Sequence, residues 1–371
     1  MKSKITSVSV IVLMFATLIF TGCLNNNSKK KETVKFGAIL GLTGNSGSLG
    51  EDAKNGILLA IDEQNAKGGI LGKKIVLDVQ DSKTDGNTGV SIAKQMLESE
   101  AEKPIAIYTQ SSVVSMPVKP IAEKNATIMF AISGADRLLE NSKFIFRNWA
   151  NPETAGNAIV TFVSDSLKVK SIGLFYCNND YGKSMQKYVT DDCVSKGIVV
   201  KFSESYDEKD NNYKSLITEY VSQNEKLDCI YTVGLGGGLG TLTKQIREAG
   251  YTGKIISDIT APYPNVLNAA GDAGKGMYYL DFAYSNNSVS ASQKKYHDAF
   301  LKAYGKEPLN FSVVSYEAMK LLFKAIENAN SFDSDKVIAE LNKIQNYLGV
   351  FGNISVINNE VIYSMDVKQV K

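Results

Sequence analysis

The feature that most constrains the fold of this chain is a regular alternation of short, β-branched apolar runs with helical patterns. Residues 34–41 form the first apolar run. Apolar residues at helical spacing then cover 51–66, and Gly68 and Gly69 close that element. Strands that alternate with helices in this way build βαβ units around a parallel sheet. The sequence therefore predicts an α/β fold.

The alternation runs in two series of the same kind. A mature chain of about 350 residues exceeds what one hydrophobic core usually serves, so each series predicts its own doubly wound lobe. The first series has predicted strands at 34–41, 74–80, 105–108 and 127–130, with helices at 51–66, 86–98 and 113–124. The second has strands at 171–176, 199–205, 228–233, 254–257 and 276–282, with helices at 152–167, 181–196, 212–224 and 239–250.

The C-terminal quarter breaks the alternation. Helical patterns at 291–304, 311–328 and 333–344 follow one another without strands, so they are expected to complete an existing lobe. Residues 350–357 and 361–367 flank Asn358 and Asn359 and predict a hairpin. We therefore predict a first lobe made of 34–151 plus 284–346, and a second made of 152–283 plus 347–371.

The N-terminus has the features of an export signal. Lys2 and Lys4 precede an apolar run at 8–20, which is short for the ~20 residues of a membrane-spanning helix. Small residues then precede Cys23, as in lipoprotein signals, although Phe20 stands where leucine is usual. We predict a signal peptide at 1–22 and a tether at 23–33 with a lipidated Cys23, which anchors the protein to the outside of a bacterial cell membrane. Plain secretion with a free or removed cysteine is the alternative.

Charge and composition argue against several function classes. The chain has 41 Lys and Arg against 39 Asp and Glu residues, and loss of the signal peptide removes two lysines, so no basic excess supports nucleic-acid binding. A single histidine, His297, weakens any Ser-His or Cys-His hydrolase hypothesis. Cys177, Cys193 and Cys229 lack metal-site spacing and are expected to be buried free thiols. We expect no catalytic residue, no cofactor and no metal.

Several motifs resemble a known family. The first strand and its turn, at 35–44, read KFGAILGLTG, and residues 62–75 read DEQNAKGGILGKKI. The N-D-Y-G motif at 179–182 extends the likeness into the second series. Together these motifs resemble the leucine/isoleucine/valine-binding proteins, which are type I solute-binding lipoproteins of ABC importers.

The resemblance implies a two-lobed clamp with a hinge that the chain crosses three times. A monomer would enclose a small solute, either a branched-chain amino acid or a related amide or carboxylate, and deliver it to ABC permease and ATPase subunits. Ligands of open α/β sheets bind beyond the carboxyl ends of the strands. The loops expected at the cleft are 42–49, 109–113, 131–136, 177–181, 234–239 and 258–263.

In the first lobe, Ser111 and Ser112 lie between a predicted strand and a predicted helix. Their hydroxyls and the free N–H groups of the helix suit a carboxylate. Ser112 matches the family serine that binds the ligand carboxylate, and a helix cap is the alternative. In the loop of Ser133, Gly134 and Ala135, alanine occupies the family's threonine position. Ser133 either replaces that hydroxyl or only makes a turn.

In the second lobe, Tyr181 matches a family tyrosine that could close over the ligand, or it simply packs on its own lobe. Leu49 and Leu235 match family aromatic residues, so the resemblance implies a roomier, more apolar pocket. The family's acidic partner for the ligand ammonium aligns with Ile259, and the neighbouring Asp258 could take that role. If Asp258 points away, an amide, a carboxylate without an amine, or a heterocycle would fit better.

Dinucleotide binding and sensing are the other functions to consider for this sequence. The glycine run at 234–240 follows a strand as in a dinucleotide fingerprint, but Leu239 and Thr241 stand where the third glycine should be. The alternative to transport is a ligand-binding sensory protein that signals through a separate membrane partner.

Overall fold

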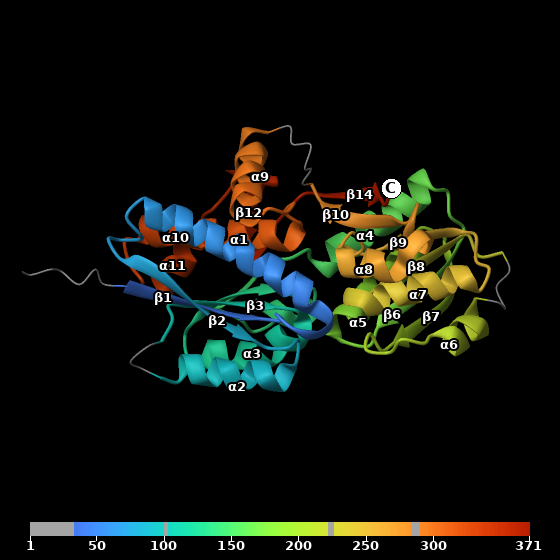
Figure 1. Cartoon of the computed structure of the whole chain (residues 1–371), viewed down its shortest axis with the longest axis horizontal. Coiled ribbons are helices and arrows are strands. Elements are labelled where there is room, and N and C mark those ends of the chain that lie inside the picture. Colours follow the sequence, from blue (N-terminus) through green and yellow to red (C-terminus); the bar gives the residue numbers. More distant parts are fainter. Residues whose placement is uncertain (1–32, 100–102, 222–225, 284–289) are drawn as a thin grey trace, which may run out of the picture.

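The computed structural model describes residues 33–371 except 100–102, 222–225 and 284–289. The predicted signal peptide and Cys23 lie outside these described residues. Two α/β lobes stand side by side in Figure 1, each with its own sheet. None of the helices in the described ranges combines the length and apolar character needed to cross a membrane.

The first lobe is built on an eight-stranded sheet in the order β11-β12-β13-β5-β4-β3-β1-β2. Its strands are β1 (Thr33–Leu40), β2 (Lys74–Asp81), β3 (Ala106–Gln110), β4 (Ile128–Ile132), β5 (Ile145–Arg147), β11 (Tyr347–Gly349), β12 (Gly352–Ile357) and β13 (Glu360–Ile362). Its helices are α1 (Gly47–Ala66), α2 (Gly86–Leu97), α3 (Ser112–Lys124), α9 (Ala291–Tyr304), α10 (Asn310–Ala329) and α11 (Ser334–Leu341).

The second lobe has a six-stranded sheet in the order β14-β10-β9-β8-β6-β7. Its strands are β6 (Ser171–Cys177), β7 (Val199–Tyr206), β8 (Cys229–Val233), β9 (Lys254–Ser257), β10 (Tyr278–Phe282) and β14 (Met365–Gln369). Its helices are α4 (Pro152–Thr161), α5 (Asp180–Ser195), α6 (Lys214–Tyr220), α7 (Gly236–Glu248) and α8 (Pro264–Ala270). A π-helical turn, Phe162–Ser166, continues α4.

Five strands in each lobe repeat one doubly wound order: β2-β1-β3-β4-β5 in the first and β7-β6-β8-β9-β10 in the second. All of these pairs are parallel. The predicted fold class is therefore confirmed. In each sheet the order reverses between two strands, β1 and β3 or β6 and β8, and ligands of such sheets bind at this reversal.

Both faces of the first sheet are covered, which explains its continuous apolar strands. All five positions of β3 and of β4 are buried. Along β1, Ile39 packs into the cluster that contains residues of α2 and α3. Its neighbours Ala38 and Leu40 belong to the cluster that contains residues of α1 and α10. Successive side chains of one strand thus enter two different helical layers.

The C-terminus differs from the predicted lobe boundary. Strands β12 and β13 form a hairpin around Asn358 and Asn359, but the predicted second strand, 361–367, is divided between β13 and β14. The hairpin and β11 join the first lobe, and only β14 joins the second. Glu360 pairs with Arg147 of β5 in the sheet, and their side chains form an ion pair with Nε and Oε1 2.9 Å apart. Arg147 is only 3% exposed, so a buried cation needs this carboxylate. This ion pair joins the hairpin to the first lobe. The hydrophobic period of the strands does not predict it, because the two residues are far apart in the chain.

The three cysteines Cys177, Cys193 and Cys229 are buried and free, as predicted.

A buried carboxyl group in the first lobe generates a test of stability. Glu317 of α10 accepts a hydrogen bond from the Val350 N–H through Oε1. Its Oε2 has no hydrogen-bond partner among the described residues. Burial raises the pKa of Glu317 from 4.5 to about 7. Between pH 4.5 and about 7 the Glu317 carboxyl is therefore protonated in the folded chain and ionised in the unfolded chain. The free energy of unfolding falls as the pH rises through this range, because the folded state must then hold a buried charge.

We predict that Glu317→Gln raises the free energy of unfolding at pH 8 by about 1–3 kcal/mol. The amide keeps an oxygen for the Val350 N–H and removes the buried charge. The gain should shrink towards zero at pH 4.5, and chemical denaturation of the ligand-free protein at several pH values measures it. Glu248→Gln, on the surface of α7, serves as the control. A gain that does not depend on pH would contradict the assignment.

Candidate functional site

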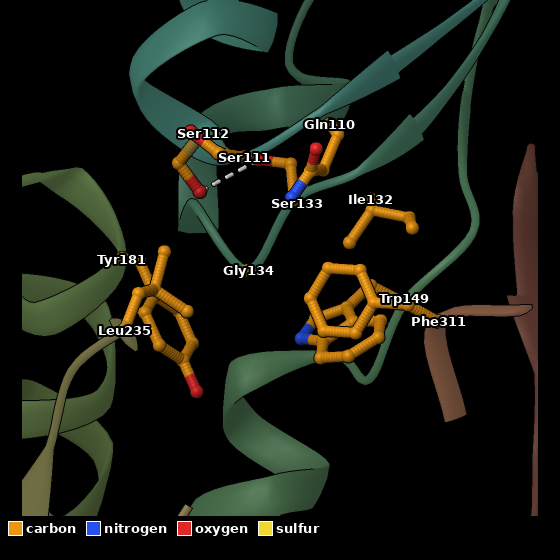
Figure 2. Close-up of a pocket in the computed structure, with 10 residues that line it drawn as sticks. All are labelled: Gln110, Ser111, Ser112, Ile132, Ser133, Gly134, Trp149, Tyr181, Leu235 and Phe311. Carbon is orange, nitrogen blue, oxygen red and sulfur yellow. Dashed lines mark hydrogen bonds between the residues drawn. The ribbon is translucent and has the colours of Figure 1, made fainter. Parts of the chain in front are cut away.

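A cavity lies between the lobes, where loops at the carboxyl ends of both sheets face each other. About 330 Å³ of this region is not filled by atoms, a volume that includes space open to solvent. Both lobes contribute to its wall (Figure 2). The lining residues are Gln110, Ser111, Ser112, Ile132, Ser133, Gly134, Trp149, Tyr181, Leu235 and Phe311.

The apolar part of the wall has two sides. In Figure 2, Tyr181 and Leu235 of the second lobe face Trp149, Phe311 and Ile132 across the cavity. The Trp149 and Phe311 rings pack with their centroids 4.7 Å apart. Neither ring was among the predicted ligand contacts. Trp149 is the only tryptophan in the sequence, and this was the one feature that could have marked it. Its position could not be predicted, because the three-residue strand β5 that precedes it was not predicted.

The polar part of the wall begins at the N-terminus of α3. Ser112 Oγ lies 2.9 Å from Ser133 Oγ, so the structure brings together the two predicted hydroxyls. Ser111 precedes the helix with a φ of +74°, which is rare for a residue other than glycine. Strained backbone of this kind clusters at functional sites. Ser111 Oγ is buried and has no hydrogen-bond partner among the described residues.

Gln110 is a polar lining residue that the sequence analysis did not single out. Its Oε1 accepts a hydrogen bond from the Gly41 N–H at 3.0 Å. This bond fixes the orientation of the amide, and Nε2 is left buried with no hydrogen-bond partner in the described part of the chain. In Figure 2 the amide nitrogen points away from the helix and towards the interior of the site.

Asp258 does not line the cavity. It is 1% exposed, and four groups donate hydrogen bonds to its two oxygens. These donors are the Thr260 N–H and hydroxyl, the Gly234 N–H and the Tyr181 hydroxyl. Burial raises the pKa of Asp258 to about 6, although these hydrogen bonds oppose the shift.

Two other predicted residues also lie away from the cavity. Leu49 is fully buried in the core of the first lobe, and Ala135 is buried with its carbonyl bound to Arg147. Of the predicted ligand contacts, the structure therefore gathers Ser111, Ser112, Ser133, Gly134, Tyr181 and Leu235 around one cavity. The other three predicted contacts, Leu49, Ala135 and Asp258, do not line the cavity.

A wider cleft continues outward from Leu235 and includes Glu208. The Glu208 carboxylate accepts hydrogen bonds from the Leu235 N–H and from Asn179 Nδ2. Burial, with the negative charges of Asp258 and Asp207, raises the pKa of Glu208 to about 8. In the described part of the chain, no group of three or more His, Cys, Asp or Glu side chains is placed to hold a metal ion.

The lobes touch on two sides of the cavity. On one side, the Tyr181 ring lies against Gly134, and Tyr188 donates a hydrogen bond to Asp136 at 2.8 Å. On the other, the Tyr263 hydroxyl lies 2.6 Å from Asn310 Oδ1. The two lobes are thus in contact on both sides of the cavity.

Comparison with known proteins agrees with this geometry. A leucine-, isoleucine-, valine-, threonine- and alanine-binding protein of Pseudomonas aeruginosa is 24% identical over 332 residues, which cover 88% of this chain and 87% of that protein. A leucine-binding protein of Thermotoga maritima has a TM-score of 0.85 at 27% identity, over 91% of this chain and 96% of its own.

A solute-binding protein of a Rhodopseudomonas palustris ABC transporter, solved with 3,4-dihydroxybenzoic acid, has the same fold. Its TM-score is 0.80 at 20% identity, over 91% of this chain and 93% of its own.

The relatives are binding proteins and not enzymes, which confirms that prediction at the level of the family. The sequence model of the periplasmic binding proteins matches residues 33–371, almost the whole described chain. Membership of the periplasmic binding protein family implies that the protein acts outside the cytoplasm. With two doubly wound lobes that meet around one cavity, this chain belongs to the periplasmic binding protein family.

Proposed function

We propose that this protein is the extracytoplasmic solute-binding lipoprotein of an ABC importer, which captures a small polar solute and delivers it to a permease. The observation that carries this proposal is a cavity lined by residues of both lobes. A solute held there contacts both lobes only when they are closed. Binding therefore shifts the equilibrium between open and closed forms, and a permease can recognise the closed form.

The cavity suits a solute with one polar end and an apolar body. Ser112 and the N-terminus of α3 offer donors and a positive helix end to a carboxylate. Trp149, Phe311 and Leu235 offer apolar surface to the rest of the molecule. A branched-chain amino acid or a related amide or carboxylate has this form. The relatives named for leucine, isoleucine and valine, and the fold neighbour solved with an aromatic acid, support this range.

The proposal includes attachment to the membrane through Cys23. The short apolar segment and the small residues before Cys23 support lipidation, and the tether up to residue 33 would let the clamp reach its permease. Mass spectrometry of the protein from bacterial membranes tests this point. An unmodified Cys23, or cleavage at another site, would contradict it.

A thermal-shift screen of the soluble chain from Lys29 tests the transport proposal. Amino acids, amides, short carboxylates and purines would be compared, because a solute that binds only the folded protein raises its melting temperature. A rise with an amino acid or a short carboxylate is expected. No rise with any member of the panel would count against solute capture.

We predict that Ser112→Ala weakens solute binding by about 1–3 kcal/mol, since the lost hydroxyl faces a charged group. Titration calorimetry with the solute found in the screen measures the change. Ser115→Ala is the matched control: it lies on the same helix, but its hydroxyl pairs with Thr109 and does not line the cavity. Equal effects of the two substitutions would exclude Ser112 as a ligand contact.

We also predict that Gly134→Ala weakens binding by about 1–3 kcal/mol through overpacking. A Cβ at this position would lie 2.5 Å from Tyr181 Cδ2, so the ring of the opposite lobe could not close fully. The melting temperature of the ligand-free protein should change little. Gly237→Ala is the control, because its Cβ would meet no atom within 4 Å. Unchanged affinity of Gly134→Ala would show that Tyr181 does not close over the solute.

A further inference from the structure

The cavity offers hydrogen-bond donors and no free carboxylate. None of its ten lining residues is Asp or Glu. An ammonium group removed from water is strongly disfavoured unless a counter-charge or several acceptors receive it. Whether this site can hold an α-amino acid therefore depends on the carboxylates at its edge, and both Asp258 and Glu208 already accept hydrogen bonds from the protein.

Asp258 is the first such acceptor. An ionised carboxylate has about four positions at which it accepts hydrogen bonds. Thr260 donates twice to Oδ1, at 2.9 and 2.7 Å, and Gly234 and Tyr181 each donate to Oδ2, at 3.1 and 3.2 Å. An ammonium could bind Asp258 only by displacing one of these donors.

Two backbone carbonyls and a second carboxylate near the cavity also accept hydrogen bonds. The buried Arg147 guanidinium donates to the carbonyl oxygens of Ser133 and Ala135, at 3.0 and 2.9 Å. Glu208 is bound by the Leu235 N–H and by Asn179 Nδ2, and it lines the outer cleft instead of the cavity.

The unpaired groups, Gln110 Nε2 and Ser111 Oγ, can both donate; the hydroxyl can also accept, but it carries no charge to balance an ammonium. Gln110 Nε2 carries two N–H bonds and cannot accept, and the Gly41 N–H on Oε1 prevents the amide from flipping. Gln110 Nε2 and Ser111 Oγ are both buried without a hydrogen-bond partner among the described residues. Gln110 is 1% and Ser111 6% exposed. Leaving buried donors unpaired costs free energy, so a ligand that fits this site supplies acceptors to them.

We infer that the solute of this cavity is a carboxylate whose second polar group is a hydrogen-bond acceptor, such as a 2-oxo acid with an apolar side chain, and not an α-amino acid. The carboxylate binds at Ser112 and the N-terminus of α3. The second acceptor takes the N–H groups of Gln110. The inference rests on the proposed function, because it names the class of solute that the same cavity captures.

A matched pair of solutes tests the inference. Leucine and 4-methyl-2-oxopentanoate share a carboxylate and a side chain, and they differ only in an ammonium against a carbonyl group. Titration calorimetry on the soluble chain should give at least tenfold tighter binding of the 2-oxo acid. Leucine binding as tight or tighter, or no binding of the 2-oxo acid, overturns the inference. Binding of leucine but not of the 2-oxo acid would overturn the inference and still support the proposed function. If no solute of the panel binds, the result counts against the proposed function as well.

A substitution at Gln110 provides the second test. Gln110→Glu keeps an oxygen for the Gly41 N–H and replaces the two donors with an acceptor. We expect at least a tenfold loss of 2-oxo acid affinity and a shift of preference towards leucine, with the melting temperature of the ligand-free protein as the check on folding. Gln186→Glu adds the same charge on α5, away from the cavity, and should leave affinity unchanged. Equal 2-oxo acid affinity in Gln110→Glu and wild type would overturn the role of Gln110.

Discussion

The hydroxyl group of Tyr263 is buried where the two lobes meet, and the contact between them depends on its hydrogen bonds. It lies 2.6 Å from Asn310 Oδ1 and 3.2 Å from Asp52 Oδ2, and it accepts a bond from the Phe311 N–H at 2.8 Å. Asn310 in turn donates to the Ile259 carbonyl of the second lobe. Because the Phe311 ring lines the cavity, the contact that joins the lobes also shapes the site.

The two lobes contribute different chemistry to the cavity. The first supplies hydrogen-bond donors at the carboxyl end of β3, where Gln110, Ser111 and the start of α3 converge. The second supplies Tyr181 and Leu235, while its carboxylate Asp258 holds the neighbouring loops together. A buried polar network whose groups are all paired is rigid and costly to rearrange. The proposed specificity of the site thus rests mainly on the donors that the first lobe leaves unpaired.

The sequence predicted most of the fold, and six of the ten residues that line the cavity were among the predicted ligand contacts. The apolar periods predicted most strands and helices of both lobes but not β5, β11 or α8, and Ser112, Ser133 and Tyr181 lie in the cavity wall. Trp149 and Phe311 were missed because Trp149 follows β5 and Phe311 lies at the start of α10. Local sequence patterns do not show where these two elements lie relative to the cavity. The hairpin was assigned to the wrong lobe, since the Arg147–Glu360 ion pair that joins it to the first lobe connects residues far apart in the chain.

The sequence by itself determined the doubly wound architecture, because hydrophobic periods and glycine-rich turns act over a few residues. It also placed serines at the start of a helix, where unpaired N–H groups attract an anion. Only the tertiary structure decided which polar groups remain free to bind a solute. Asp258 and Gln110 are both buried polar residues near the cleft, yet four donors occupy the first and the Gly41 N–H leaves the amide nitrogen of the second unpaired. Hydrogen-bond capacity is settled by neighbours in space, and a linear pattern does not contain them.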